Sequence, residues 1–171
     1  IARALEAAHA KNIIHRDLKP ENVYLQQIDD DKPLVKLLDF GLAKSTNKEE
    51  GLVAKTRTGQ LLGTPLYMSP EQCKSKGVDH RTDIYALGCI LYEMLIGEPP
   101  FTGPTAQAII ARVMIEEPRS LTLQRKTIPP QVEAAVLGAL QKLPAVRGNW
   151  NVHAQPSIRP AASWMAALMR W

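Results

Sequence analysis

A continuous apolar run places the strongest limit on how this chain can fold. The run extends from Ile84 to Ile96, is interrupted by Glu93 and stops at Gly97. A helix that is apolar on nearly all faces belongs in the middle of a core. The run is also shorter than the roughly 20 residues that a bilayer-crossing helix needs. It therefore predicts a buried central helix and no membrane span in this chain.

The composition favours one compact domain. The chain has 171 residues, of which 45% are hydrophobic and 22% are charged. The net charge of +4 is not gathered in a long basic block, which argues against nucleic-acid binding. Cys73 and Cys89 lack the second cysteine pair or nearby histidines of a zinc site or a disulfide framework. We therefore expect reduced thiols and a cytoplasmic location.

Periodicity predicts the other elements. Apolar residues at helical spacing begin at Ile1 with no capping residue before them, so we expect the chain to start inside a helix and to be a truncated product. Two short strands are expected at 23–25 and 34–38. Amphipathic helices are expected at 105–115 and 130–143, where prolines suit the first turns.

The predicted turn between the two strands contains Asp29, Asp30, Asp31 and Pro33. Three adjacent carboxylates could bind a cation. We favour a solvated hairpin turn, because aspartates followed by proline are common in turns.

The segment from His15 to Asn22 combines groups suited to phosphoryl transfer. It reads His-Arg-Asp-Leu-Lys-Pro-Glu-Asn, which we interpret as a polar loop held between ordered elements. Asp17 offers a base and Lys19 an ammonium group that can neutralise phosphate. Asn22 offers an oxygen ligand for a hard cation.

A second acid, Asp39, directly follows the second predicted strand and precedes Phe40 and Gly41. A glycine permits an unusual backbone angle, so the acid at the strand end can point toward a cleft. The order of the two segments, with a hairpin between them, strengthens the interpretation of both.

The 15–22 loop resembles the catalytic loop of eukaryotic-type protein kinases, because it matches their H-R-D-L-x-x-x-N pattern at every specified position. Residues 39–41 resemble their D-F-G element. Lys19 together with Thr64 is typical of the serine/threonine class, and the run 67–72 is similar to bacterial members.

The resemblance implies a role for each of these polar residues. Asp17 would accept the proton of the substrate hydroxyl, and Lys19 would neutralise charge on the transferred group. Asn22 and Asp39 would hold Mg²⁺ together with ATP.

Residues 45–62 are polar and lack periodicity, and the resemblance makes them the activation segment. A phosphate on Thr56 or Thr58 would then be bound by Arg16. The alternative is that both threonines are merely exposed hydroxyls. The following segment, 63–71, resembles the family's G-T-x-x-Y-x-x-P-E pattern.

Three residues resemble structural positions of the family. Asp83 opens the central helix and is implied to tie down the backbone of the catalytic loop. Arg147 lies in a run similar to K-D-P-x-x-R, with Leu143 in place of the aspartate, and is implied to pair with Glu71.

The resemblance covers residues 1–147, which correspond to one of the two kinase lobes. The glycine-rich loop and the strand lysine of the N-terminal lobe do not occur in the expected order. We therefore expect a mainly α fold, a protein-kinase-like C-terminal lobe with a small β-hairpin at the catalytic cleft. The surface toward the absent N-terminal lobe would expose apolar side chains.

Residues 148–171 contain no Asp, Glu or Lys but hold all three tryptophans, and they do not resemble the family. In order of preference, they are a divergent last helix, out-of-frame or fusion sequence, or a helix that binds a partner or a membrane surface.

The implied function is that of a serine/threonine protein kinase fragment that uses ATP and Mg²⁺ to phosphorylate protein hydroxyls. One alternative is a non-catalytic, pseudokinase-like fragment that holds a partner near residues 104–115. Another is a small-molecule phosphotransferase, which the 63–71 segment disfavours. A membrane anchor in the parent enzyme is left open.

Overall fold

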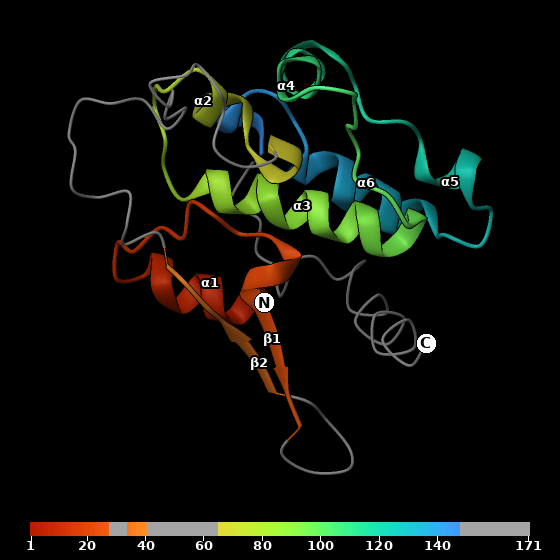
Figure 1. Ribbon diagram of the computed structural model, residues 1–171. Helices are drawn as coiled ribbons and strands as arrows, with labels where there is room; N and C mark the ends of the chain where they lie inside the picture. The colour runs from red at the N-terminus through yellow and green to blue at the C-terminus, as the bar shows by residue number, and fades with distance from the viewer. Residues whose placement is uncertain (28–33, 41–64, 148–171) are drawn as a thin grey trace.

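The computed structural model describes residues 1–27, 34–40 and 65–147. The described part is mainly helical, with one small sheet (Figure 1). The elements are α1 (Ala2–His9), η1 (Pro20–Asn22), β1 (Val23–Gln26), β2 (Leu34–Leu37), η3 (Pro65–Tyr67), α2 (Pro70–Cys73), α3 (Arg81–Ile96), α4 (Ala106–Ile115), α5 (Leu121–Gln124), α6 (Pro130–Ala139) and η4 (Pro144–Val146).

Helix α3 crosses the middle of the molecule (Figure 1). Every residue from Thr82 to Tyr92 is buried. In Figure 1, α1 and the β1–β2 hairpin lie on one side of α3, and α2 and α4 lie on the other. The core cluster joins side chains of α3 to those of α1, α4, α5 and α6. The prediction of a buried central helix is confirmed.

The contact between α3 and α6 is close because α3 carries a glycine there. A Cβ atom added to Gly88 would lie only 2.9 Å from Cβ of Ala139. A side chain at this position would therefore push the two helices apart.

Within the described ranges, no helix combines the length and the apolar character needed to span a bilayer.

The two predicted strands form an antiparallel hairpin. Val23 pairs with Leu37 and Gln26 pairs with Leu34, which fixes the register. The ends of the hairpin nearest the rest of the domain are therefore residues 22 and 38. The predicted turn with Asp29, Asp30 and Asp31 lies outside the described residues.

The helix ends follow local capping chemistry. The side chain of Thr105 accepts the backbone N–H of Ala108, so α4 begins at Ala106. Helix α3 ends at Ile96 and is followed by Gly97, which has a left-handed φ of 96°. Pro130 is the first residue of α6, as predicted, but Pro104 lies before the cap of α4 and not in its first turn.

The predicted length of the helix at 130–143 is wrong, because α6 ends at Ala139 and not at Leu143. Leu143 precedes Pro144, and a residue before proline is disfavoured in the helical region. It adopts an extended conformation and is 65% exposed. The helical periodicity in the sequence therefore continued for one turn beyond the helix itself.

The observed architecture agrees with the expected mainly α fold and its small hairpin. Its assignment to a C-terminal lobe, and the boundary at residue 147, stay predictions. Residues 148–171 lie outside the described residues.

Candidate active site

The carboxylate of Asp83, in the first turn of α3, holds the backbone of the 15–22 loop. Its Oδ2 accepts the N–H of His15 and its Oδ1 accepts the N–H of Arg16, both at 2.8 Å. Oδ2 also lies 2.7 Å from Nε2 of His9. Because Asp83 is fully buried, these contacts replace lost hydration. The geometry is that expected of a residue that organises the loop.

Arg16 has a backbone conformation that is uncommon for a residue with a side chain. Its φ is 65°, in the left-handed region. Its N–H is bonded to Asp83, and its carbonyl oxygen accepts a hydrogen bond from Nε2 of Gln72 at 2.7 Å. Contacts from two helices therefore hold this strained residue in place.

His15 connects the loop to the end of β2. Its Nε2 lies 2.9 Å from the carbonyl oxygen of Leu38. A carbonyl oxygen only accepts hydrogen bonds, so Nε2 carries the proton. Nδ1 faces the backbone N–H of Asp17 at 3.4 Å, as an acceptor. The ring of His15 also packs against Phe40, with centroids 4.7 Å apart.

Asn22 makes a second connection to the same strand end. Its backbone oxygen accepts the N–H of Leu38 at 2.9 Å, which continues the β1–β2 ladder by one residue pair. Its side-chain Nδ2 donates to the backbone oxygen of Asp17 at 2.7 Å. The opposite amide atom, Oδ1, is then left as the acceptor. Asp39 follows Leu38, so the hairpin brings Asn22 and Asp39 to the same end of the sheet.

Asp17 and Lys19 form an ion pair between Oδ2 and Nζ at 3.2 Å. Their side chains are 40% and 39% exposed, respectively. An exposed pair of this kind adds little to stability. Both groups therefore lie within reach of a ligand, in contrast to the buried residues that support them.

Asp39 is exposed and has a φ of 54°. The sequence attributed the unusual backbone angle to Gly41, which lies outside the described residues. In the structure, Asp39 itself adopts the left-handed conformation. Aspartate tolerates this region better than most residues with a side chain, and Asn12 and Ser75, outside the site, adopt it as well.

The oxygen groups of Asn22 and Asp39 fit a magnesium site completed by a nucleotide. Mg²⁺ prefers oxygen ligands and is usually bound by one or two carboxylates together with substrate phosphates. Among the described residues, no cluster of three or more His, Cys, Asp or Glu side chains could hold a metal alone.

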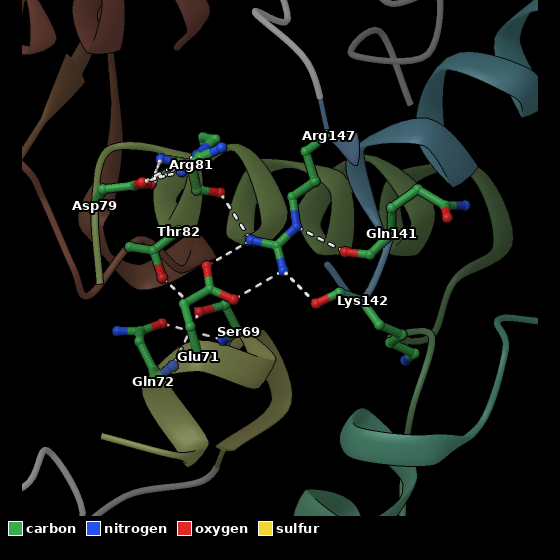
Figure 2. Close-up of polar contacts among 9 residues, drawn as sticks. All are labelled: Ser69, Glu71, Gln72, Asp79, Arg81, Thr82, Gln141, Lys142 and Arg147. Atoms are coloured by element: carbon green, nitrogen blue, oxygen red, sulfur yellow. Dashed lines mark hydrogen bonds and ion pairs between the residues drawn. The ribbon is translucent and has the colours of Figure 1, made fainter. Parts of the chain in front are cut away.

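Glu71 and Arg147 form the ion pair that the sequence predicts (Figure 2). Nη1 and Nη2 of Arg147 contact the two carboxylate oxygens of Glu71 at 2.5 and 2.8 Å. Both residues are buried. The guanidinium also donates to the backbone oxygens of Arg81, Gln141 and Lys142. The pair therefore fastens α2 to α3 and to the segment after α6.

Tyr67 attaches η3 to the central helix. Its hydroxyl donates to Oε2 of Glu93 at 2.6 Å. Burial, reinforced by this bond to a carboxylate, raises the pKa of Tyr67 well above its usual value. The hydroxyl therefore stays protonated and keeps its role as a donor.

Sequence reasoning missed two residues that support the loop, His9 and Gln72. No local pattern around His9 indicates its contact with Asp83, 74 positions away. For Gln72, the spacing Ser69-x-x-Gln72 predicts the capping box that the structure contains at the start of α2. That pattern does not predict the contact of Gln72 with Arg16.

Three residues of the expected site, Thr56, Thr58 and Thr64, lie outside the described residues. Their roles in activation and substrate choice stay predictions.

Several large apolar side chains are exposed on the hairpin side of the domain. Tyr24 and Leu25 of β1 are 53% and 48% exposed, and Leu34 of β2 is 45% exposed. Ile13 and Leu38 are similarly exposed. Whether these side chains face an N-terminal lobe, as the sequence predicts, stays a prediction.

Comparison with known proteins agrees with this geometry. The family described as "Protein kinase domain" matches residues 1–156. Over 149 residues the chain is 43% identical to serine/threonine-protein kinase pkn3 of Myxococcus xanthus, covering 86% of this chain and 27% of that protein. Over 142 residues it is 39% identical to serine/threonine-protein kinase PknB of Mycolicibacterium smegmatis, covering 83% and 22%.

A further relative is Pkn1 of Myxococcus xanthus, a serine/threonine-protein kinase that is 40% identical over 147 residues, 86% of this chain and 21% of that protein. The chain thus spans about a quarter of the length of these curated relatives. The family match covers most of the chain and includes every described residue of the site. The chain therefore belongs to the protein kinase domain family.

Proposed function

We propose that this domain transfers the γ-phosphate of ATP to serine and threonine hydroxyls of proteins, and that residues 1–147 form its catalytic lobe. The observation that carries the proposal is the double connection of Leu38. Its carbonyl accepts from His15 and its N–H donates to Asn22. The acid that follows, Asp39, is thereby tied to the loop that contains Asp17.

Asp17 is the proposed general base. Its carboxylate is partly exposed, and its backbone is held through Asn22 and His15. A positioned carboxylate can accept the proton of a substrate hydroxyl as that oxygen attacks phosphorus. Lys19, 3.2 Å from Asp17, is proposed to neutralise charge on the transferred group.

Asn22 and Asp39 are the proposed ligands of magnesium. When bound with ATP, Mg²⁺ would neutralise charge that develops on the phosphate oxygens. The protein itself fixes these two ligands at one end of the hairpin. The backbone hydrogen bond between Leu38 and Asn22 limits the distance between Asn22 and Asp39, which follows Leu38.

Proposals about the rest of the protein follow from the family. We propose that an N-terminal lobe covers the face of the hairpin that carries Tyr24 and Leu34, since these exposed apolar side chains would otherwise be in contact with water. We also propose that Arg16 binds an activation-segment phosphate on Thr56 or Thr58.

The two free cysteines support a reducing, cytoplasmic compartment.

The test is an Asp17→Ala substitution in the full natural protein, with transfer of labelled phosphate to serine, threonine and tyrosine peptides. We expect transfer to serine and threonine peptides to fall about 10²- to 10⁴-fold, because the general base is lost. Glu116→Ala is the matched control, since Glu116 is an exposed acid on another surface. Near-normal transfer by the Asp17 variant would refute the proposal.

A further inference from the structure

We propose that Gln72 is a positioning residue that fixes the orientation of the Asp17 backbone, so that the start of α2 controls the geometry of the general base. The inference rests on the proposed function of Asp17. It adds a residue that acts on the reaction through the catalytic loop without touching the substrate.

The peptide group between Arg16 and Asp17 is held on both sides. Its carbonyl oxygen accepts from Nε2 of Gln72 at 2.7 Å. Its N–H faces Nδ1 of His15 at 3.4 Å. A peptide group is planar, so contacts at both ends fix its rotation and with it the direction in which Asp17 leaves the backbone.

The contact of Gln72 compensates for an unfavourable backbone conformation. Arg16 has a φ of 65°, which only its surroundings can maintain. Asp83 holds its N–H, and Gln72 is the described side chain that holds its carbonyl oxygen. Without Gln72, one of these two restraints would be lost, and the part-buried carbonyl of Arg16 would lose this donor.

Gln72 can carry out this role because α2 is itself firmly attached (Figure 2). Gln72 is 3% exposed. Ser69, the cap of α2, forms a hydrogen bond with Thr82, which is next to Asp83 in α3. Glu71 is paired with Arg147. The contacts thus form a closed ring from α3 through α2 to the catalytic loop and back to α3.

The two ends of the Gln72 amide have separate tasks, which allows a selective test. Oε1 accepts the N–H of Ser69 at 3.0 Å, in the capping box. Nε2 donates to Arg16. Glutamate is the other residue suited to this position of a capping box. The substitution Gln72→Glu therefore preserves the acceptor in the cap of α2 but replaces the donor to Arg16 with a second acceptor, which repels the carbonyl oxygen.

The experiment measures peptide phosphorylation by the full natural protein with Gln72→Glu. We expect kcat to fall about tenfold to a hundredfold, with KM for ATP and peptide nearly unchanged, because the base is displaced while the binding groups remain. Hydrogen–deuterium exchange of the segment 13–22 should become faster, and exchange in α3 should not change. Gln131→Glu, an exposed substitution in the first turn of α6, is the control for added negative charge.

An unchanged kcat, or a loss of thermal stability without faster exchange in the 13–22 segment, would overturn the inference. If Gln72→Glu does not fold, Gln72→Met replaces it, with the same two readouts. Because Gln72→Met also removes the capping acceptor, it is compared with Ser69→Ala, which weakens the same cap but keeps the donor to Arg16. Asp17→Asn is measured in parallel. Activity retained in Asp17→Asn would contradict the proposed function itself, whereas an inactive Asp17→Asn beside a fully active Gln72→Glu would contradict only the role of Gln72.

Discussion

Asp83 accepts the backbone N–H of Arg16 at 2.8 Å, although the two residues are 67 positions apart in the chain. One buried carboxylate on the central helix thereby connects the core of the domain to the 15–22 loop. Through Asp83, the stability of the core and the geometry of the site are linked.

Substituting Asp83 should lower both the stability of the domain and the rate of phosphate transfer. Asp83→Asn places an amide NH₂ group against backbone donors, so at least one buried N–H loses its acceptor. We expect the free energy of unfolding to fall by about 1–3 kcal/mol and phosphate transfer to fall with it. Urea denaturation and initial rates measure the two effects.

The control for Asp83→Asn is Asp79→Asn. Asp79 is partly exposed, and its hydrogen bond to Arg81 lowers the pKa of its carboxyl. Because the pKa of Asp79 is lower in the folded protein, its ionised carboxylate stabilises the fold at pH values above the pKa of the unfolded state. This contribution to stability is lost as the pH falls through the pKa of the folded state. Because the pair is exposed, we expect a loss below about 1 kcal/mol at neutral pH. Equal effects of the two substitutions would contradict a special role for Asp83.

Breaking the Glu71–Arg147 pair should be costly. Arg147→Met leaves the buried carboxylate of Glu71 without its partner, and we expect a loss of about 3–5 kcal/mol in chemical denaturation. Arg112→Met removes an exposed pair whose atoms are 3.7 Å apart and should cost less than about 1 kcal/mol. If the ion pair is the cause, adding Glu71→Gln to Arg147→Met will cost less than the sum of the two single losses.

Two substitutions of glycine by alanine should change the stability of the fold in opposite directions. Gly88→Ala places a methyl group 2.9 Å from Cβ of Ala139, and we expect a loss of about 1–3 kcal/mol from overpacking. Gly138→Ala, in α6, meets no atom within 4 Å and should stabilise the helix by up to about 1 kcal/mol. Thermal melting of both variants measures the difference. A neutral Gly88→Ala would mean that α3 and α6 are not in such close contact.

The thiol of Cys73 should react slowly in the folded protein. Burial, and then the negative charge of Glu71, raises the pKa of Cys73 to about 11. Because the pKa of Cys73 is higher in the folded than in the unfolded protein, the protonated thiol favours the folded state. This contribution to stability is fully present below the pKa of the unfolded state and is lost as the pH increases toward 11. We expect iodoacetamide at pH 8 to modify Cys73 far more slowly than the same residue in urea, as followed by mass spectrometry. Equal rates would show that the thiol is not protected.

The motifs that resemble protein kinases indicated the loop with Asp17 and Asn22, the acid at Asp39 and the partners Glu71 and Arg147. The structure confirms the Glu71–Arg147 pair, and the roles of Asp17, Asn22 and Asp39 in catalysis stay predictions. The connection through Leu38 was not indicated, since it depends on backbone hydrogen bonds that no side chain reveals. The same is true of Gln72, whose capping pattern is visible in the sequence but whose long-range contact is not.

The error in the fold has a local cause. Apolar residues continue at helical spacing through Leu143, but Pro144 and the contacts of Arg147 with backbone carbonyls end the helix earlier. Hydrophobic periodicity indicates where a helix would have an apolar face. It does not indicate where backbone carbonyl groups accept hydrogen bonds from side chains and the helix therefore ends.

The most direct test of the account is a titration with Mn²⁺ in the presence of ATP, followed by electron paramagnetic resonance. Mn²⁺ replaces magnesium at oxygen sites. The unmodified protein should bind Mn²⁺ in an ATP-dependent manner, and Asp39→Asn and Asn22→Ala should each weaken this binding about tenfold or more. Unchanged binding in both variants would contradict the claim that the end of the hairpin holds Asn22 and Asp39 around a shared divalent site.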